Sequence, residues 1–272
     1  MNIFIPYGGR TDWGEELRYA LRSLDSFFEP FNLTVYSTAT PEWLIGCKSL
    51  DIERFYPSRL EKKYGCRKYE HWFDSMNKLR VYAESETEER FIYTYDDILL
   101  LRDASAKDIV PYPQEEIVQR HKLRFSRSRH GETILSALNK CDRGLLFNYE
   151  THTPRIYETE KLRELFTKFP LEKEIIPYSI ATLYFNYYDH EIHEEIALVD
   201  NYKVGFYGKP GGGGYSSSSM EEVKNAVNGK MWLNYSFSGL MARDGNGKTN
   251  LKTWIIDNFK TKSKYEGCIN NN

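Results

Sequence analysis

The sequence contains few cysteines, and they are far apart. The four are Cys47, Cys66, Cys141 and Cys268, and no two of them have Cys-x-x-Cys spacing. Zinc sites built from cysteine usually need such pairs. We therefore expect reduced thiols rather than a zinc site.

Long apolar runs and a strong net charge are also missing. No stretch is long enough to span a bilayer. The N-terminal MNIFIPYGGR lacks the basic leader and apolar core of a signal peptide. The formal net charge is −2, so no overall field draws the chain to nucleic acid or membranes. We expect a cytoplasmic protein without a membrane span.

The composition is that of a globular protein, with 40% apolar and 28% charged residues. A length of 272 residues suits one large domain, and no internal repeat is visible. We predict a single catalytic domain over residues 1–272. It divides into halves at 1–110 and 111–272, with the seam at VPYPQEE.

The first 38 residues have the pattern of a β-α-β unit. Residues 3–5 (IFI) form a short strand that Pro6 stops, and residues 33–38 (LTVYST) form a second strand. Asp12 and Glu15 fit a helical capping box between them. Such units imply a parallel sheet, so we predict an α/β, Rossmann-like fold with a mostly parallel sheet.

Further elements follow from apolar periodicity. We expect helices at 69–83 and 159–169, the latter stopped by Pro170. A strand is expected at YKVGFYG, and Ser219 with Glu222 forms a second capping box. A last helix carries apolar residues at helical spacing: Leu251, Trp254, Ile255 and Phe259.

Two adjacent carboxylates, Asp96 and Asp97, interrupt the apolar stretch RFIYTYDDILLL. Open α/β sheets bind ligands beyond the carboxyl ends of their strands. Residues 7–12, 37–40 and 96–97 should meet there. A divalent ion such as magnesium takes one or two protein carboxylates. Neighbours on a strand point to opposite faces, so both aspartates reach one ion only if the backbone turns. The alternative is a solvent-facing turn.

The turn PYGGRTD presents a second candidate site. Tyr7, Gly8 and Gly9 lead to a helix N-terminus, where backbone N–H groups attract anions, and Arg10 adds a charged fork for phosphate. The turn is neither G-x-G-x-x-G nor a Walker loop. The alternative is a tight turn that needs only the backbone freedom of glycine.

Three other segments carry candidate residues. His152 lies in a polar loop and is a candidate general acid or base, unless it is a loop histidine without a role. Arg243 lies in MARDGNGKTN, which is either a phosphate clamp or a turn. The stretch RHKLRFSRSRH is strongly basic and suits phosphates of a nucleotide, an acidic glycan or DNA, or it is a solvated loop. Its cations are Arg120, Lys122, Arg124, Arg127 and Arg129.

Several segments together resemble the Stealth family of sugar phosphotransferases. EELRYALRSLDSFF, LTVYSTATPEWL and ERFIYTYDDILLLRD look like the second block of that family. THTPRIYETEKLRELFTKFP looks like the third block, and LKTWIIDNFKTKSKYEG is similar to the fourth, which ends in Ser-x-Phe/Tyr-Glu. Two places depart from the family. IFIPYGGR replaces the first block, and Tyr95-Asp96-Asp97 replaces Asn-Asp-Asp.

The resemblance implies a glycosyltransferase-A-type core with a nucleotide-sugar donor, for which a UDP-sugar is favoured. Residues 1–110 then bind the donor, and residues 111–272 face the acceptor. It implies catalytic roles for Asp97, His152 and Arg243. Asp96 and Asp97 would hold Mg²⁺ or Mn²⁺. The donor would contact Tyr7, Gly8, Gly9, Arg10, Arg18 and Thr38.

The predicted reaction is transfer of a sugar-1-phosphate to a glycan hydroxyl. One alternative is a glycosyltransferase that moves the sugar alone, with a glycan or a modified DNA base as acceptor. The same core serves both reactions, because a fold does not determine the chemistry. A second alternative is a non-catalytic module that binds carbohydrate or nucleotide.

Overall fold

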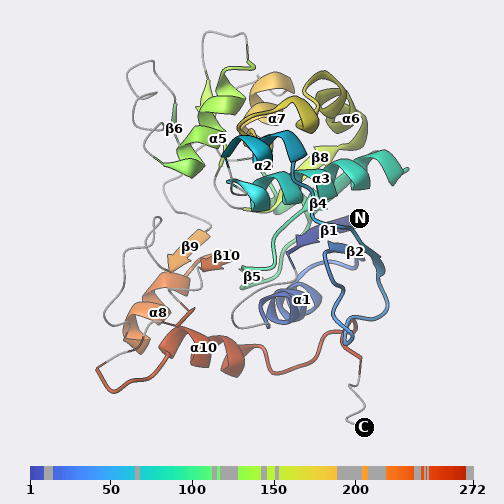
Figure 1. Cartoon of the computed structure of the whole chain (residues 1–272). Helices are drawn as coiled ribbons and strands as arrows, with labels where there is room; N and C mark the ends of the chain where they lie inside the picture. The colour runs from blue at the N-terminus through green and yellow to red at the C-terminus, as the bar shows by residue number, and fades with distance from the viewer. Residues whose placement is uncertain are drawn as a thin grey trace. The chain divides into compact units, whose positions relative to one another are not determined.

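The structure is a computed structural model (Figure 1). It describes residues 1–8, 15–64, 68–111, 115–116, 128–141, 146–150, 153–188, 204–207, 219–235, 240–241, 243 and 245–267. The chain forms two compact units. Unit 1 comprises Met1–Asp51, Ile92–Ile109 and Asn201–Asn272, and unit 2 comprises Ile52–Phe91 and Val110–Asp200. The action of residues 1–272 as one catalytic domain stays a prediction.

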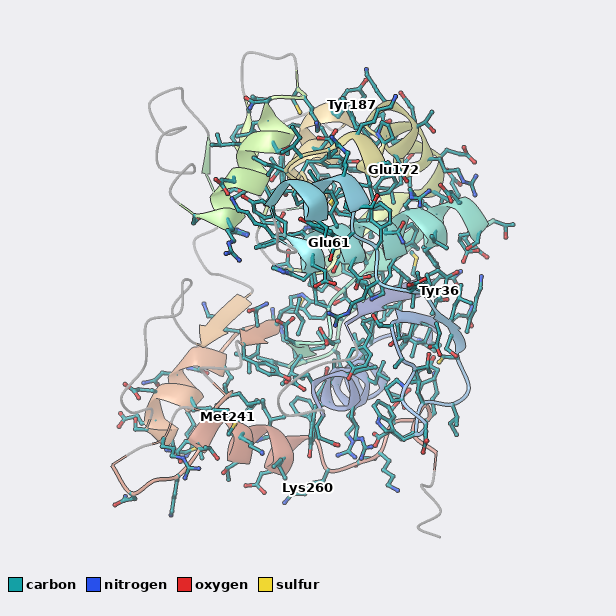
Figure 2. The ribbon with its side chains drawn as sticks, viewed as in Figure 1. Tyr36, Glu61, Glu172, Tyr187, Met241 and Lys260 are labelled. Atoms are coloured by element: carbon teal, nitrogen blue, oxygen red, sulfur yellow. The ribbon has the colours of Figure 1, made fainter. Side chains whose placement is uncertain are left out.

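Unit 1 contains the predicted β-α-β opening. Strand β1 (Asn2–Tyr7), helix α1 (Glu16–Phe27) and strand β2 (Asn32–Ser37) follow one another. β1 and β2 pair in parallel, and β3 (Lys48–Asp51) continues the sheet in parallel beyond β2. The interior is aromatic: the Tyr36 ring (Figure 2) packs edge-on against Phe4, with centroids 5.3 Å apart. The prediction of a mixed α/β fold with a mostly parallel sheet is confirmed.

Pro6 does not stop the first strand, contrary to the prediction. β1 continues through Pro6 to Tyr7, and Pro6 stays in register with Tyr36. Next in strand order is β4 (Arg90–Tyr93), and Thr94 N–H donates to Phe4 O at 3.1 Å. Alternate residues of a strand face the same neighbour, so Pro6 faces this side but has no N–H to donate. Pro6 therefore ends the hydrogen-bonded pairing between β1 and the chain that follows β4. It does not end strand β1 itself.

Helix α1 begins later than the predicted capping box indicates. Its first residue is Glu16, and the side chain of its N-cap Glu15 makes no capping bond. The Glu16 carboxylate accepts a hydrogen bond from Glu15 N–H at 3.1 Å instead. A carboxylate in the first turn also interacts favourably with the helix dipole. Asp12 lies outside the described residues.

A second, three-stranded sheet completes unit 1, in the order β5 (Ile98–Leu100), β10 (Trp232–Tyr235) and β9 (Val204–Tyr207). β10 runs antiparallel to β5 and parallel to β9. Helices α8 (Met220–Val227) and α10 (Asn250–Asn258) lie side by side (Figure 1). A buried cluster joins these helices to α1 and the sheet: Tyr19, Leu99, Val223, Leu233, Tyr235, Leu240, Leu251, Ile255 and Phe259. The predicted last helix, strand β9 and the Ser219–Glu222 capping box are confirmed.

Unit 2 is mainly helical. Its helices are α2 (Ser58–Tyr64), α3 (Glu70–Ser85), α5 (Arg129–Leu138), α6 (Thr159–Lys168) and α7 (Ile180–Tyr188). Its strands include β6 (Glu115–Glu116), β7 (Phe147–Asn148) and β8 (Arg155–Glu158). Short 3-10 turns lie at Ala106–Asp108 of unit 1 and at Leu171–Lys173 of unit 2. The predicted helices at 69–83 and 159–169 are confirmed, and within the described part of the chain no helix is long and apolar enough to cross a membrane.

Candidate active site

Three strands of unit 1 end in one row. Tyr7 of β1 pairs with Ser37 of β2, and Ser37 pairs with Asp51 of β3. The loop after β2 is held by side chains: Ala39 N–H donates to Ser37 Oγ at 3.0 Å. Thr40 N–H and Oγ1 both donate to Asp51 Oδ1, at 2.8 and 2.5 Å, and these bonds lower the pKa of Asp51. Thr38 is therefore placed at the sheet edge by a well-braced loop.

Asp96 and Asp97 form the turn between β4 and β5. Both side chains are partly exposed. The turn comes after Thr94, where Pro6 ends the hydrogen-bonded pairing between β1 and the chain that follows β4. The adjacent carboxylates thus leave strand geometry, as a shared site requires. Their roles stay a prediction.

A buried tyrosine accompanies this turn. Tyr235, the last residue of β10, donates its N–H to Asp97 O at 3.3 Å. Its side chain is 1% exposed, and its hydroxyl has no hydrogen-bond partner within the described chain. Burial raises the pKa of Tyr235 well above its usual value, and the charges of Asp97, Glu16 and Asp96 raise it further. The hydroxyl therefore stays protonated and can act as a hydrogen-bond donor.

Glu16 is the third of these carboxylates, and it is only 5% exposed. It is the first residue of α1, and its charge acts, like those of Asp96 and Asp97, to raise the pKa of Tyr235. Sequence reasoning missed Glu16 and Tyr235. The signal for Glu16 was an acidic residue at a helix start, which is common. Nothing local marked Tyr235 among 21 tyrosines.

The glycine turn is described only in part. Tyr7 is buried at the end of β1, and Gly8 follows it. Gly8 has no positive φ, and a Cβ placed on it would meet no atom of the described residues within 4 Å. Neither backbone conformation nor packing therefore requires glycine at this position. Gly9 and Arg10 lie outside the described residues.

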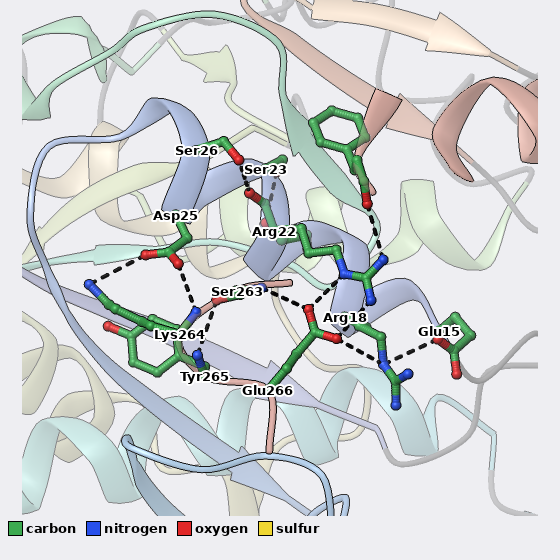
Figure 3. Close-up of polar contacts among 12 residues, drawn as sticks. Glu15, Arg18, Arg22, Ser23, Asp25, Ser26, Ser263, Lys264, Tyr265 and Glu266 are labelled. Carbon is green, nitrogen blue, oxygen red and sulfur yellow. Dashed lines mark hydrogen bonds and ion pairs between the residues drawn. The ribbon is translucent and has the colours of Figure 1, made fainter. Parts of the chain in front are cut away.

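Arg18 lies on α1 and is held by protein groups. Its Nε is 3.2 Å from Glu15 Oε2 and 3.6 Å from Glu266 Oε2. Its guanidinium lies over the Trp43 ring, 4.7 Å from the centroid. Figure 3 shows Arg18 and Arg22 directed to the same carboxylate, Glu266.

The segment Ser263–Glu266 forms a clasp across α1, and it is the Ser-x-Tyr-Glu ending noted in the sequence. Glu266 accepts from Arg22 Nε and Nη2 and from Ser263 N–H. Burial acts to raise the pKa of Glu266, but these bonds and the charges of Arg22 and Arg18 outweigh it, so the pKa is lowered. Tyr265 donates its hydroxyl to Phe31 O at 3.0 Å. The clasp therefore holds α1 to the segment that follows α10.

Arg243 and Arg129 are the described residues of two other predicted regions. Arg243 is exposed, and its Nη1 donates to Gly247 O at 3.0 Å, closing its own loop. Arg129 is exposed in the first turn of α5. His152 lies outside the described residues, and so do four of the predicted DNA contacts: Arg120, Lys122, Arg124 and Arg127.

Comparisons with known proteins identify the fold. No protein-family model and no curated protein sequence matches the chain. The crystal structure of galactosyltransferase LgtC with donor and acceptor sugar analogs matches with a TM-score of 0.50 at 10% identity, over 97% of this chain and 98% of that one. A structure of an active-site mutant of LgtC matches at 0.49 and 10% identity over the same shares. The LgtC likeness shows a glycosyltransferase-A-type α/β fold.

Proposed function

We propose that the chain is a nucleotide-sugar-dependent glycosyltransferase that moves a sugar to a glycan hydroxyl. The observation that carries the proposal is the Asp96–Asp97 turn, which follows strand β4 of a glycosyltransferase-A-type fold and whose Asp97 carbonyl oxygen accepts a hydrogen bond from Tyr235 N–H. Ligands of open α/β sheets bind at this edge. The favoured donor is a UDP-sugar.

The donor nucleotide would lie along the braced edge of unit 1. Tyr7, Gly8 and Thr38 border that edge, and the open space over Gly8 lets a ligand approach the backbone closely. Gly9 and Arg10 follow directly and would contact the diphosphate at the start of the chain leading to α1. Arg18 would add positive charge from α1.

Asp96 and Asp97 would hold a divalent ion, Mg²⁺ or Mn²⁺. In the part of the chain that the structure describes, no three His, Cys, Asp or Glu side chains gather as a metal site. Magnesium takes only one or two protein carboxylates and leaves its other positions to substrate and water. Two partly exposed carboxylates on one turn supply donors of that type and number. When bound, the ion would neutralise charge on the departing nucleotide phosphate.

The remaining roles follow from the chemistry of the residues. Tyr235 would donate a hydrogen bond from its hydroxyl to an oxygen of the bound nucleotide-sugar, because a buried O–H without a partner costs free energy until it is paired. His152 would accept the proton of the attacking hydroxyl, and Arg243 would offer a cation to phosphate. Positioning and electrostatic stabilisation would supply most of the rate enhancement.

Transfer of a sugar-1-phosphate is the second candidate. It is favoured by the order of the Stealth-like segments and by the Ser263–Glu266 clasp, which uses the ending of the fourth segment to hold α1. In this reaction the acceptor oxygen attacks phosphorus and releases nucleoside monophosphate. In glycosyl transfer the oxygen attacks the anomeric carbon and releases nucleoside diphosphate. The released nucleotide therefore distinguishes the two.

The acceptor in either reaction is proposed to be a glycan. A modified base in DNA is the alternative acceptor, and it depends on the basic segment that ends at Arg129. Cations that contact phosphates make DNA binding strongly dependent on salt. Salt-sensitive binding of duplex DNA that is lost in an Arg124→Gln, Arg127→Gln, Arg129→Gln variant would support the DNA acceptor. Absence of binding at low salt would remove it.

The full chain should be incubated with a panel of nucleotide sugars, glycan acceptors and DNA, with and without Mg²⁺ or Mn²⁺. We expect nucleoside diphosphate to be released with a glycan acceptor. Release of monophosphate would replace the proposal with sugar-phosphate transfer. Donor binding without turnover for any acceptor would indicate a binding module. No binding of any donor would contradict the proposal.

A further inference from the structure

A pocket in unit 1 lies at the C-terminal end of α1 and has a volume of about 340 Å³. Its walls are the end of α1, the chain leaving β5, the turn between α8 and β10, and the end of α10. Small-molecule sites typically occupy about 300–1,000 Å³ and combine aromatic walls with a few polar groups. The pocket has a size and a lining of this kind, and no role in the proposed transfer uses it.

Three aromatic rings form one wall. Phe259 packs edge-on against Phe27 and against Trp254, with centroids 6.4 and 6.1 Å apart. Phe259 is buried, whereas Phe27 and Trp254 are partly exposed. The two outer rings therefore offer apolar surface to the pocket. A pyranose ring presents a face of C–H groups, which packs well on such surface.

The polar lining carries positive charge. Arg102 and Lys230 line the pocket, and no carboxylate among the described residues does so. The nearest acid in sequence on α10, Asp257, pairs with Lys260 at 3.3 Å. Asp103 follows Arg102 but is not part of the lining. The described lining is therefore more favourable for an anion than for a cation.

Two amides complete the lining, Asn228 and Asn258. Asn258 Nδ2 donates to the backbone oxygen of Trp254 at 2.8 Å, which fixes the orientation of the amide. The Asn258 carbonyl oxygen is an acceptor and the Asn228 side chain is both donor and acceptor. Such groups pair readily with sugar hydroxyls.

Backbone hydrogen bonds hold the segments that carry these groups. Gly229 has a φ of +68°, a conformation that favours glycine in the turn after α8. Lys230 N–H donates to Val227 O at 3.1 Å, and Leu101 N–H donates to Met231 O at 2.9 Å. These bonds hold the α8–β10 turn beside the chain that leaves β5. The cations and rings are thus presented from braced segments.

The pocket is remote from the strand edge. Phe27 is the last residue of α1 and Glu16 is the first. At a rise of about 1.5 Å per residue, the two ends are about 16 Å apart. A ligand in the pocket therefore does not occupy the position proposed for the donor.

We propose that this pocket is a second, non-catalytic site that binds an acidic saccharide. The sugar ring packs on Trp254 and Phe27, and its carboxylate or sulfate pairs with Arg102 and Lys230. Asn228 and Asn258 hydrogen-bond its hydroxyls. The inference goes beyond the proposed transfer, since it needs neither a donor nor turnover.

The test is a titration of the full ¹⁵N-labelled chain, without any nucleotide sugar. The probe is a tetrasaccharide of alternating glucuronic acid and N-acetylglucosamine, and the uncharged control is the N-acetylglucosamine tetramer. Trp254 is one of five tryptophans, so its indole N–H resonance is assigned with Trp254→Phe. We expect the acidic probe to shift this resonance saturably and to bind at least tenfold more tightly than the uncharged one.

Matched variants locate the site. Arg102→Gln with Lys230→Gln should weaken binding at least tenfold, whereas Lys48→Gln with Lys107→Gln, which removes two exposed charges elsewhere in unit 1, should not. Equal weakening by both pairs, equal affinity for the neutral tetramer, or a Trp254 shift produced equally by uridine monophosphate would overturn the proposal. Saturable binding in a chain that turns over no donor would refute only the proposed transfer.

Discussion

Glu266 and Arg22 are 244 positions apart, and Arg22 Nε and Nη2 donate to the two Glu266 carboxylate oxygens at 2.6 and 2.8 Å. The Glu266 side chain is only 2% exposed. Arg22 also donates from Nη1 to Phe259 O at 3.0 Å, which joins α1 to the end of α10. The pair therefore fastens the C-terminal segment of the described chain to the helix that leads to the candidate site (Figure 3).

Glu266→Gln should destabilise unit 1. Loss of the bidentate ion pair with Arg22 is expected to lower the free energy of unfolding by about 1.5–3 kcal/mol at pH 7. The pKa of Glu266 is lowered in the folded chain. Its contribution is therefore present above the unfolded carboxyl pKa of about 4.3 and is lost as pH falls through the folded pKa. Urea unfolding at a series of pH values measures this.

Asp103→Asn is the matched control for that experiment, because Asp103 is an exposed carboxylate in unit 1. Its unfolding free energy should stay within about 0.5 kcal/mol of the parent. The difference in unfolding free energy between the parent and Glu266→Gln should become smaller at acidic pH. If it did not, packing rather than the charge pair would stabilise the clasp.

Asp97→Asn and Asp96→Asn should reduce turnover with little effect on folding, since both side chains are partly exposed on a turn. We expect kcat to fall at least 100-fold for Asp97→Asn, which corresponds to about 2.7 kcal/mol. The measurement is nucleotide release at saturating donor, with Mg²⁺ or Mn²⁺ varied. Asp103→Asn again serves as control, and full activity in both site variants would remove the pair from the mechanism.

Gly8→Ala tests whether the absence of a side chain at position 8 serves ligand binding or folding. Gly8 has no positive φ and open space above it, so alanine should change stability by no more than about 0.5 to 1 kcal/mol, in the stabilising direction. If the donor lies against this backbone, the added methyl should raise KM about tenfold or more. Thermal unfolding and steady-state kinetics together test this. Unchanged kinetics would move the donor away from Gly8.

Tyr235→Phe removes a buried hydroxyl that has no partner within the described chain. We expect the free energy of unfolding to be unchanged or raised by up to about 1 kcal/mol. We expect kcat/KM to fall about tenfold, because the substrate loses its hydrogen bond from the Tyr235 hydroxyl.

Tyr265→Phe is its counterpart, since that hydroxyl does donate, to Phe31 O. It should cost about 1 kcal/mol of stability and leave turnover per folded molecule unchanged. Tyr235→Phe should therefore lower kcat/KM without loss of stability, and Tyr265→Phe should lower stability without loss of turnover. A Tyr235→Phe enzyme with parental kcat/KM and lower stability would make Tyr235 a structural residue.

Local patterns predicted much of the fold. The β-α-β opening, helices α3 and α6, strand β9 and the Ser219–Glu222 cap all follow from periodicity and short-range hydrogen bonding. The sequence also marked Asp96 and Asp97 as a turn after a strand. These features depend on residues a few positions apart, which is the range over which a sequence pattern carries information.

Other features depended on contacts between distant segments. Pro6 was expected to stop β1, but it ends a ladder because the chain at Thr94 comes to lie beside it. Tyr235 meets Asp97 across 138 positions of sequence, and no periodicity marks it. The pocket beside Trp254 collects residues from four separate segments.

By itself, the sequence determined the kinds of element, the parallel α/β class and the acidic turn, because local propensity and side-chain period act within each segment. Only the tertiary structure decided which distant groups meet: Tyr235 N–H on Asp97 O, and Glu266 on Arg22. Packing and charge pairing bring those groups together, and both depend on the path of the whole chain through space.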